Sequence, residues 1–295
     1  MISVPAIEKS EIRHHYNWAT PFYRLLWGVH IHHGLWEADE SPRVAQHRLV
    51  TTMIDRAGIQ PGARVLDVGC GMGGSSIQLA RDSGCQVTGV TLSPVQRRWA
   101  ALGARWQGVR QRTQFICGDA EHVDFANESF DIVWSIECTE HLFDKLSFFQ
   151  RAAHWLRPGG KMIICAWLAG GDELDELLTQ QVEKVCTGFL CPSLGSANDY
   201  RRWMSDAGLR AVSYDDWTSR TLRTWEICQQ RVDRSRLRTV AHLVRGMATF
   251  LDSFETILAA YRSGAMQYGC FVFTKPYEHA SQPTAISSGN LAGAT

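Results

Sequence analysis

Residues 65–96 read VLDVGCGMGGSSIQLARDSGCQVTGVTLSPVQ, and this stretch decides the fold. A run of apolar and β-branched residues gives way to four glycines between Gly69 and Gly74, and apolar residues at helical spacing follow. This order predicts a strand, a glycine turn and a helix, with a second strand over residues 85–91. Two such strands joined through a helix form half of a doubly wound parallel sheet, which binds its ligand across the carboxyl ends of the strands.

Asp67 stands two residues before the first glycine of the turn. A dinucleotide-binding fingerprint spaces its glycines GxGxxG and holds pyrophosphate at the helix N-terminus, whereas here the spacing is GxGxGG. A carboxylate beside the turn would repel pyrophosphate, but it suits a ligand that carries an ammonium group. The residues therefore favour such a ligand over NAD, and an NAD-dependent oxidoreductase stays as an alternative.

The composition narrows the possible partners and the compartment. The chain has 295 residues with 30 basic and 30 acidic side chains, so its formal net charge is zero. Nucleic acid and anionic membranes usually require a basic excess, and we expect neither as a partner. The nine cysteines include no CxxC pair, which indicates buried free thiols in a reducing compartment. We find no secretion signal and no span long and apolar enough for a bilayer, so we expect a cytoplasmic protein.

The rest of the chain extends the α/β pattern. Periodicity predicts helices over residues 41–58, 94–108 and 146–156, and strands over 114–117, 129–136, 161–168, 211–217 and 268–275. The segment before the last strand is longer than a connection between neighbouring strands, so that strand should return antiparallel. We therefore expect an α/β, Rossmann-like, doubly wound sheet of seven mostly parallel strands with an antiparallel last strand. The expected units are an N-terminal helical lid (1–40), a ligand-binding core (41–218), a helical cap over the pocket (219–267), the final strand (268–276) and a disordered tail (277–295).

Three polar side chains follow the strand predicted over residues 129–136, namely Glu137, Glu140 and His141. Because that strand ends at the ligand edge of the sheet, we expect them at the mouth of the pocket. Each can take a proton at neutral pH once its pKa is tuned, so they are candidate bases. Asp119 also follows a strand, where its carboxylate can accept a hydrogen bond from an adenine amino group, with a turn or N-cap role as the alternative.

His30, His32 and His33 lie close together near the N-terminus. They could bind a metal or simply pack and cap locally. We expect local packing and no metal, because no partner set at ligand spacing stands elsewhere in the sequence.

Several motifs stand together that are typical of one family. They are HHGLW (32–36), VGCGMGGSS (68–76), TLSPVQ (91–96), FDIVWSIECTEH (130–141), LRPGG (156–160) and the late pair DW (216–217). With the DxGxGxG pattern that begins at Asp67, the chain resembles the class I S-adenosylmethionine (SAM) methyltransferases of the tocopherol methyltransferase-like group, over roughly residues 30–276. The resemblance implies SAM as methyl donor, S-adenosylhomocysteine as product and residues 41–218 as the SAM-binding core. The group also methylates alkaloid nitrogens, and no plastid transit peptide precedes the motifs, so we expect a bacterial-type small-molecule enzyme.

The resemblance also implies a set of cofactor-binding residues. The methionine end of SAM would be held by Asp67, Gly69, Gly71 and Gly73, with Ser135 close to the methionine group. The ribose would lie along Thr91, Leu92 and Gln96, and adenine between Asp119 and Ala120. The N-terminal residues expected to close over the cofactor are Tyr16, Tyr23 and His33.

The predicted function is methyl transfer from SAM to a hydrophobic, aromatic or isoprenoid small molecule, by C- or N-methylation. Alignment of acceptor, methyl and sulfur would supply most of the catalysis. Glu137 or His141, with Glu140 as a third candidate, would accept a proton where the acceptor must lose one. An aromatic acceptor pocket is expected from Trp167, Phe189, Tyr200, Trp217, Trp225 and Phe250. A SAM-binding sensor without turnover is the alternative of another class, and a monomer and a homo-oligomer both stay open.

Overall fold

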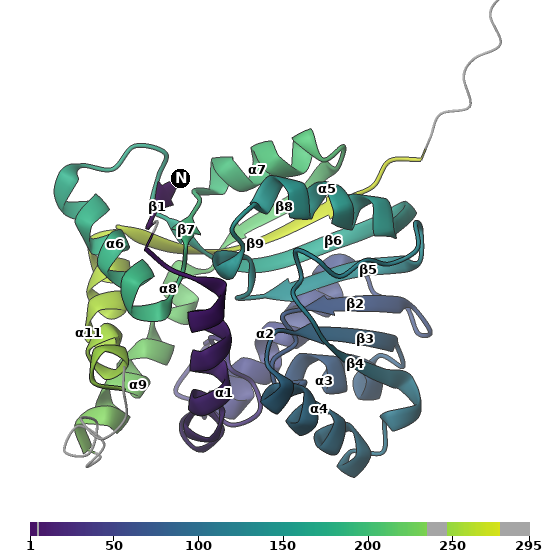
Figure 1. Cartoon of the computed structure of the whole chain (residues 1–295), viewed down its shortest axis with the longest axis horizontal. Helices are drawn as coiled ribbons and strands as arrows, with labels where there is room; N and C mark the ends of the chain where they lie inside the picture. The colour runs from purple at the N-terminus through teal and green to yellow at the C-terminus, as the bar shows by residue number, and fades with distance from the viewer. Residues whose placement is uncertain (5, 235–246, 278–295) are drawn as a thin grey trace, which may run out of the picture.

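The computed structural model describes residues 1–4, 6–234 and 247–277. Its centre is a seven-stranded sheet in the order β4-β3-β2-β5-β6-β9-β8 (Figure 1). The strands are β2 (Arg64–Val68), β3 (Gln86–Thr91), β4 (Thr113–Cys117), β5 (Phe130–Ile136), β6 (Leu156–Ala169), β8 (Arg210–Asp216) and β9 (Met266–Thr274). The pairs from β4 to β6 are parallel, and β9 is antiparallel to both of its neighbours. The expected fold class is therefore confirmed, including the antiparallel last strand.

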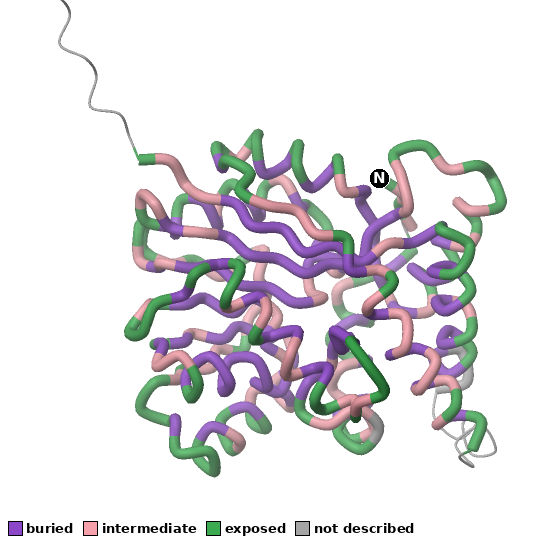
Figure 2. Tube along the Cα trace, turned by 180° about the vertical axis from the view of Figure 1, so that it is seen from behind, coloured by how far each residue is buried: buried purple, intermediate pink, exposed green. Residues whose placement is uncertain are grey.

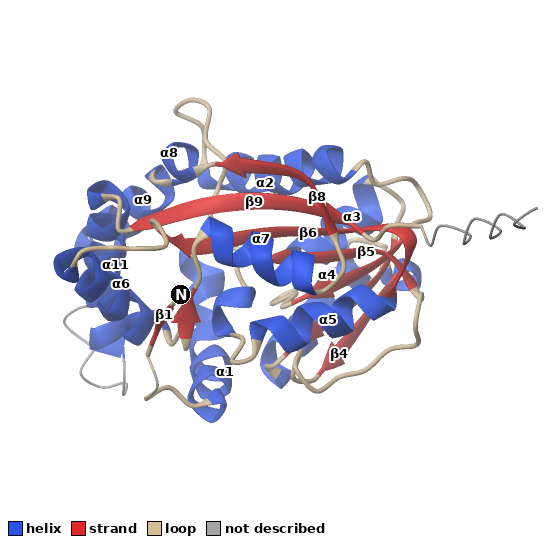
Figure 3. Ribbon diagram, turned by 90° about the horizontal axis from the view of Figure 1, so that it is seen from above, coloured by secondary structure: helices blue, strands red, loops and turns tan. Residues whose placement is uncertain are grey.

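Helices cover both faces of this sheet (Figure 3). One face packs on α2 (Pro42–Ala57), α3 (Gly74–Asp82) and α4 (Pro94–Trp106), and the other on α5 (Lys145–Trp155) and α7 (Ala197–Asp206). The central strands are buried along most of their length, as Figure 2 shows. This burial on both faces explains the continuous apolar runs that predicted parallel strands.

A group of helices lies beside one end of the sheet (Figure 1). It contains α6 (Glu176–Phe189), α8 (Thr218–Thr221), α9 (Arg223–Arg234) and α11 (Met247–Ser263), while α1 (Lys9–Leu26) lies between this group and the sheet. Helix α6 falls within the range expected to be core, yet it packs against α11. The unit boundaries stay a prediction, since residues 235–246 of the expected cap and 278–295 of the expected tail lie outside the described residues.

Two local features differ from the sequence-based expectation. Strand β6 begins at Leu156, not at Lys161, because Leu156 already pairs with Phe130 before a register shift in the ladder. A two-residue strand, β1 (Ile2–Ser3), pairs antiparallel with β7 (Ser193–Leu194), and both strands are too short to show a periodicity in the sequence. This pairing ties the start of the chain to the segment between α6 and α7. Among the described residues, no helix has the length and apolar character needed to cross a membrane.

Candidate active site

The glycine turn joins β2 to α3 and forms the floor of a cleft. Gly69, Gly71 and Gly73 all have positive φ values, of 77°, 52° and 79°. A Cβ atom added at Gly69 would lie 2.3 Å from Cβ of Cys138 on the neighbouring strand connection. Both the backbone conformation and the close approach therefore require glycine at this position.

Asp67 lies beside this turn and lines the cleft together with Gly69 and Gly71. It is only 2% exposed, and a hydrogen bond from Ser76 is the side-chain contact that the described residues give its carboxylate. Burial raises the pKa of Asp67 to about 7, with the Ser76 hydroxyl opposing the shift. A buried carboxylate with so few donors has room for a ligand ammonium group, so the cleft fits the methionine end of SAM.

The cleft continues along the carboxyl ends of β3 and β4 and encloses about 730 Å³, including space open to solvent. The Thr91 hydroxyl donates to Gln96 at 2.9 Å, and Lys9 on α1 lies 3.0 Å from Asp119. Burial would raise the pKa of Asp119, but the Glu121 amide, His122 and Lys9 together hold it below its usual value. The predicted cofactor residues that line the two parts of the cleft are Asp67, Gly69, Gly71, Thr91, Leu92, Gln96, Asp119, Ala120 and Tyr16.

Four predicted cofactor residues lie elsewhere. Gly73 is the N-cap residue of α3, where an added Cβ would meet Ala100 of α4 at 2.8 Å. Ser135 is buried in β5 and donates to the carbonyl of Val68 at 3.1 Å. Tyr23 and His33 line a second cavity next to the cleft.

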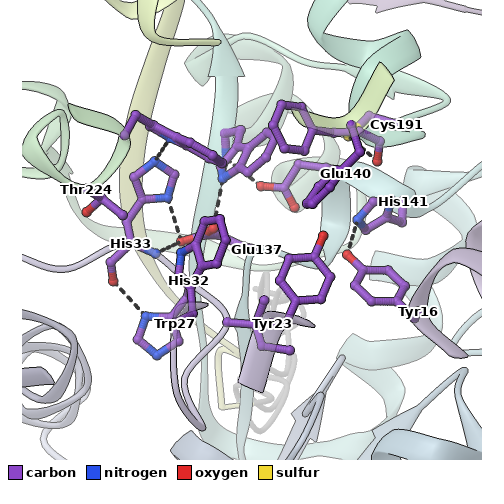
Figure 4. A pocket seen from close by; sticks show the side chains of 15 residues that line it. Tyr16, Tyr23, Trp27, His32, His33, Glu137, Glu140, His141, Cys191 and Thr224 are labelled. Atoms are coloured by element: carbon purple, nitrogen blue, oxygen red, sulfur yellow. Dashed lines mark hydrogen bonds and ion pairs between the residues drawn. The ribbon is translucent and has the colours of Figure 1, made fainter. Parts of the chain in front are cut away.

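This second cavity has a mainly aromatic wall and encloses about 560 Å³, including open space (Figure 4). Its wall includes four of the predicted acceptor residues, namely Trp167, Phe189, Trp225 and Phe250. The other two do not line it. Tyr200 is on the opposite face of the sheet, stacked on Phe271 at 5.2 Å and bonded to Thr139, and Trp217 is packed in the core.

Sequence reasoning missed further residues of this wall. They are Trp27, Ile31, His32, Cys191 and Thr224, and Tyr23 had been expected at the cofactor. The aromatic run YNWATPFYRLLWG (16–28) was the available signal, because α1 places several of its rings along one face. Cys191 and Thr224 carry no such signal, since only the tertiary fold brings them to the cavity.

Both cavities share Tyr16, Ile31, Glu137 and His141 as lining residues. Tyr16 comes from α1, Ile31 from the segment after it, and Glu137 and His141 from the connection that follows β5. A ligand in the cleft and a ligand in the aromatic cavity would therefore meet at these side chains, and Figure 4 labels Tyr16, Glu137 and His141 among them.

Glu137 is held rigidly at this junction. Its φ of 51° is unusual for a residue other than glycine. One carboxylate oxygen accepts the His33 amide at 2.7 Å and the Tyr268 hydroxyl at 2.8 Å, and the other accepts the Trp167 indole N–H at 3.0 Å. Burial would raise the pKa of Glu137, but the ring and the amide of His33, together with His32, hold it below its usual value. Glu137 is therefore an ionised anchor whose oxygens already have donors, which argues against it as the base.

Glu140 and His141 are in different electrostatic states. Burial raises the pKa of Glu140 to about 8, and its Oε2 atom is buried with no described hydrogen-bond partner. Burial lowers the pKa of His141 to about 4. Its Nδ1 donates to the carbonyl of Leu190 at 3.0 Å, so Nε2 is the acceptor for the Tyr16 hydroxyl at 2.8 Å. Near pH 7 the site thus contains a protonated carboxyl and a neutral imidazole.

The histidines near the N-terminus are buried and contact polar and aromatic side chains. His30 Nδ1 lies 3.1 Å from His32 Nε2, and both rings are buried. Nε2 of His33 accepts the Trp225 indole N–H, while Nδ1 lies 2.9 Å from Glu137. Within the described part of the chain, no group of three or more His, Cys, Asp or Glu side chains is arranged to hold a metal ion.

Comparison with known proteins agrees with this geometry. Residues 66–164 match a family described as a methyltransferase domain. The chain is 30% identical to chloroplastic tocopherol O-methyltransferase of Arabidopsis thaliana, covering 93% of this chain and 84% of the relative. It is 31% identical to 27-O-demethylrifamycin SV methyltransferase of Amycolatopsis mediterranei, covering 81% and 85%. Among solved structures, the [4+2]-cyclase SpnF superposes with a TM-score of 0.81 at 24% identity, over 93% of this chain and 98% of that one.

The fold and the two-part cleft define a SAM-dependent methyltransferase. The chain belongs to the family of small-molecule methyltransferases that includes the tocopherol and rifamycin enzymes. It is thus an enzyme that transfers a methyl group from SAM to a small molecule and leaves S-adenosylhomocysteine. The likeness to SpnF concerns the fold alone.

Proposed function

We propose that the acceptor is a hydrophobic small molecule with an aromatic ring or an isoprenoid chain, seated in the aromatic cavity. The observation that carries this proposal is the shared wall of Tyr16, Ile31, Glu137 and His141 between the two cavities. In-line transfer requires acceptor atom, methyl and sulfur on one line, and a common wall allows ligands from both sides to meet there. The buried rings around the acceptor exclude water from the reaction.

SAM supplies a methyl group on a positively charged sulfur, which is already activated for displacement. We propose that Asp67 binds the ammonium group of SAM and that the Asp119 carboxylate accepts a hydrogen bond from the adenine amino group. Lys9 would keep the Asp119 carboxylate oriented. Because the donor is activated, we also propose that transfer requires no metal.

The nine cysteines are all free and eight of them are at least partly buried, which supports a reducing, cytoplasmic location.

His141 is the base that the geometry favours for acceptors that must lose a proton. Its Nε2 atom faces the Tyr16 hydroxyl, and this pair lies at the junction of the cavities. A proton on the acceptor can pass to the Tyr16 oxygen while Tyr16 gives its own proton to His141. The low pKa of His141 keeps the imidazole ready to accept near pH 7, although it also makes the base weak.

Glu140 would act in another way. Glu140 lines the acceptor cavity, its buried Oε2 atom has no described hydrogen-bond partner, and at neutral pH the carboxyl carries a proton. We propose that it donates a hydrogen bond to an oxygen of the acceptor. A carbonyl, phenol or quinol oxygen within a largely apolar molecule would accept this hydrogen bond. A pure hydrocarbon would leave the Glu140 carboxyl without a partner.

A screen with methyl-labelled SAM against phenols, quinols, prenyl compounds and indole amines tests the acceptor class. Label should enter an apolar molecule that has one buried oxygen. A SAM-binding sensor would instead bind SAM and label nothing across the panel and across a metabolite extract. Label found only in highly polar acceptors would contradict the proposal.

The first acceptor that is labelled then permits a test of the proton path. Tyr16→Phe should lower kcat by about 100-fold. This is the lower limit of the rate gain usual for general base catalysis, and we expect it because the low pKa of His141 makes it a weak base. Tyr23→Phe is the matched control. Its ring stacks beside Tyr16 at 6.1 Å in the same cavity, but its hydroxyl bonds to His15. Equal losses in both variants would show that packing, not proton transfer, is at stake.

A further inference from the structure

Helix α4 turns its large apolar side chains outward. Its buried face is made of Gln96, Ala100 and Ala104. On the opposite side Trp99, Leu102 and Trp106 are 39%, 51% and 82% exposed. Their spacing places them on one stripe of the helix. A helix on the surface of a soluble domain normally has the reverse pattern, and a run of exposed large apolar residues marks an interaction surface.

Arginines accompany this stripe. Arg98 and Arg105 are exposed on α4 and lie two turns apart, next to the apolar side chains, and Arg110 and Arg112 follow on the 3₁₀ helix η1 (Arg110–Arg112). The sequence has no Asp or Glu between Ser93 and Gly118. These four arginines form no ion pair with a described residue. The arginines that do pair with acidic side chains lie elsewhere, such as Arg56 and Arg81. The zero net charge of the chain therefore conceals a local basic surface that has no acidic residue on its own segment.

The same surface reaches the lid of the active site. Helix α1 packs against α4, and the Ser93 hydroxyl donates to Asn17 at 2.7 Å. At the end of α1, Leu25 is 79% exposed. The opposite side of α1 supplies Tyr16 to both cavities. The outward-facing residues are thus on the elements that form the wall of the site.

We propose that this basic-aromatic face, made of Arg98, Trp99, Leu102, Arg105 and Trp106, docks on the surface of an anionic lipid membrane. Tryptophan is enriched where apolar chains meet water at a bilayer surface, and arginine is attracted by anionic headgroups. This docking is peripheral and requires no spanning helix. It does not depend on the identity of the acceptor, although a membrane would hold a hydrophobic acceptor close to the lid.

Two other occupants fit the surface less well. A second copy placed symmetrically on it would bring arginines against arginines, with no acid in this part of the chain to pair with them. Nucleic acid would pair with the arginines, but it would gain little from the exposed aliphatic chain of Leu102. An anionic bilayer satisfies both the charge and the apolar side chains.

Co-sedimentation of the whole protein with phosphatidylcholine vesicles, with and without phosphatidylserine, tests the proposal without any need for turnover. Binding should require phosphatidylserine and weaken at high salt. Arg98→Gln/Arg105→Gln should weaken it about 25-fold, since each basic residue near an anionic surface contributes about fivefold. Trp99→Ala/Trp106→Ala should weaken it about tenfold.

The controls are exposed residues of the same kinds on other surfaces. They are Leu177→Ala on α6, which is 73% exposed, and the pair Arg43→Gln/Arg210→Gln. These variants should bind like the parent protein, and calorimetry should show unchanged SAM binding in every variant. The proposal would be overturned if the control variants lost as much lipid binding, or if the parent protein did not bind lipid at all. Preferential binding to duplex DNA would also overturn it, as would a dimer that the tryptophan substitutions convert to a monomer. None of these outcomes depends on whether the acceptor class is right.

Discussion

SAM binding should weaken as the pH falls below 7, because Asp67 must be ionised to hold an ammonium group. In the free protein, burial raises the pKa of this carboxyl to about 7. At pH 6 roughly one molecule in ten would have Asp67 ionised, and at pH 7.5 about three quarters would. If only the ionised form binds tightly, the Kd for SAM should be about eightfold higher at pH 6 than at pH 7.5. Binding at pH 6 should also release nearly one proton, since the bound ammonium lowers the pKa of the carboxyl.

Calorimetry across this range measures both quantities, and repeating it in buffers of different ionisation enthalpy gives the proton count. Asp67→Asn should bind SAM more weakly at every pH and lose the pH dependence. Asp119→Asn is the matched control within the same cleft. The pKa of Asp119 is already below its usual value, so this carboxylate stays ionised throughout and its loss should leave the eightfold pH effect intact. A Kd that is constant between pH 6 and 7.5, or an equal pH effect in Asp67→Asn, would refute the assignment of Asp67 to the ammonium.

Three further predictions concern the junction and the turn. Glu140→Gln should stabilise the protein increasingly from pH 5 to pH 8, as measured by denaturant unfolding. The wild-type carboxyl ionises near 4.5 when unfolded but near 8 when folded, so wild-type stability falls by about 1.4 kcal/mol per pH unit in that window. Glu137→Gln should lower the free energy of unfolding by about 3 kcal/mol, because the His33 and Trp167 donors lose a charged acceptor. Gly69→Ala should cost about 2 kcal/mol and abolish SAM binding, because its Cβ would strike Cys138 at a φ of 77°. A variant of Gly69 that binds SAM normally would contradict the close approach seen at the turn.

The residues that line the cleft could be predicted because they stand in short, continuous motifs. The turn around Gly69, Thr91 with Gln96, and Asp119 all follow strands of a parallel sheet, and the carboxyl ends of such strands meet at one edge. Local periodicity was enough to find each strand end. Ser135 shows the limit of this reasoning. Its side chain is buried within the sheet, where the hydroxyl donates a hydrogen bond to the carbonyl of Val68.

The lining of the second cavity could be predicted only in part. Its wall comes from α1, the connection after β5, and the helices α6, α9 and α11, which no local pattern relates to one another. Aromatic character was the signal used, and it selected Trp225 and Phe250, which line the second cavity. The same signal also selected Tyr200, which lies across the sheet on Phe271, because a core ring and a cavity ring look alike in a sequence.

The three candidate bases after β5 are all buried, and their different partners explain why they differ in proton affinity. The sequence placed Glu137, Glu140 and His141 together but gave no reason to separate them. Glu137 has enough donors to stay ionised, whereas Oε2 of Glu140 has no described partner and the carboxyl retains its proton. His141 is kept neutral by the same burial, with the Tyr16 hydroxyl on its free nitrogen. One short connection therefore provides an ionised carboxylate, a protonated carboxyl and a neutral imidazole, and the donors contributed by His33, Tyr268 and Trp167 favour ionisation of Glu137.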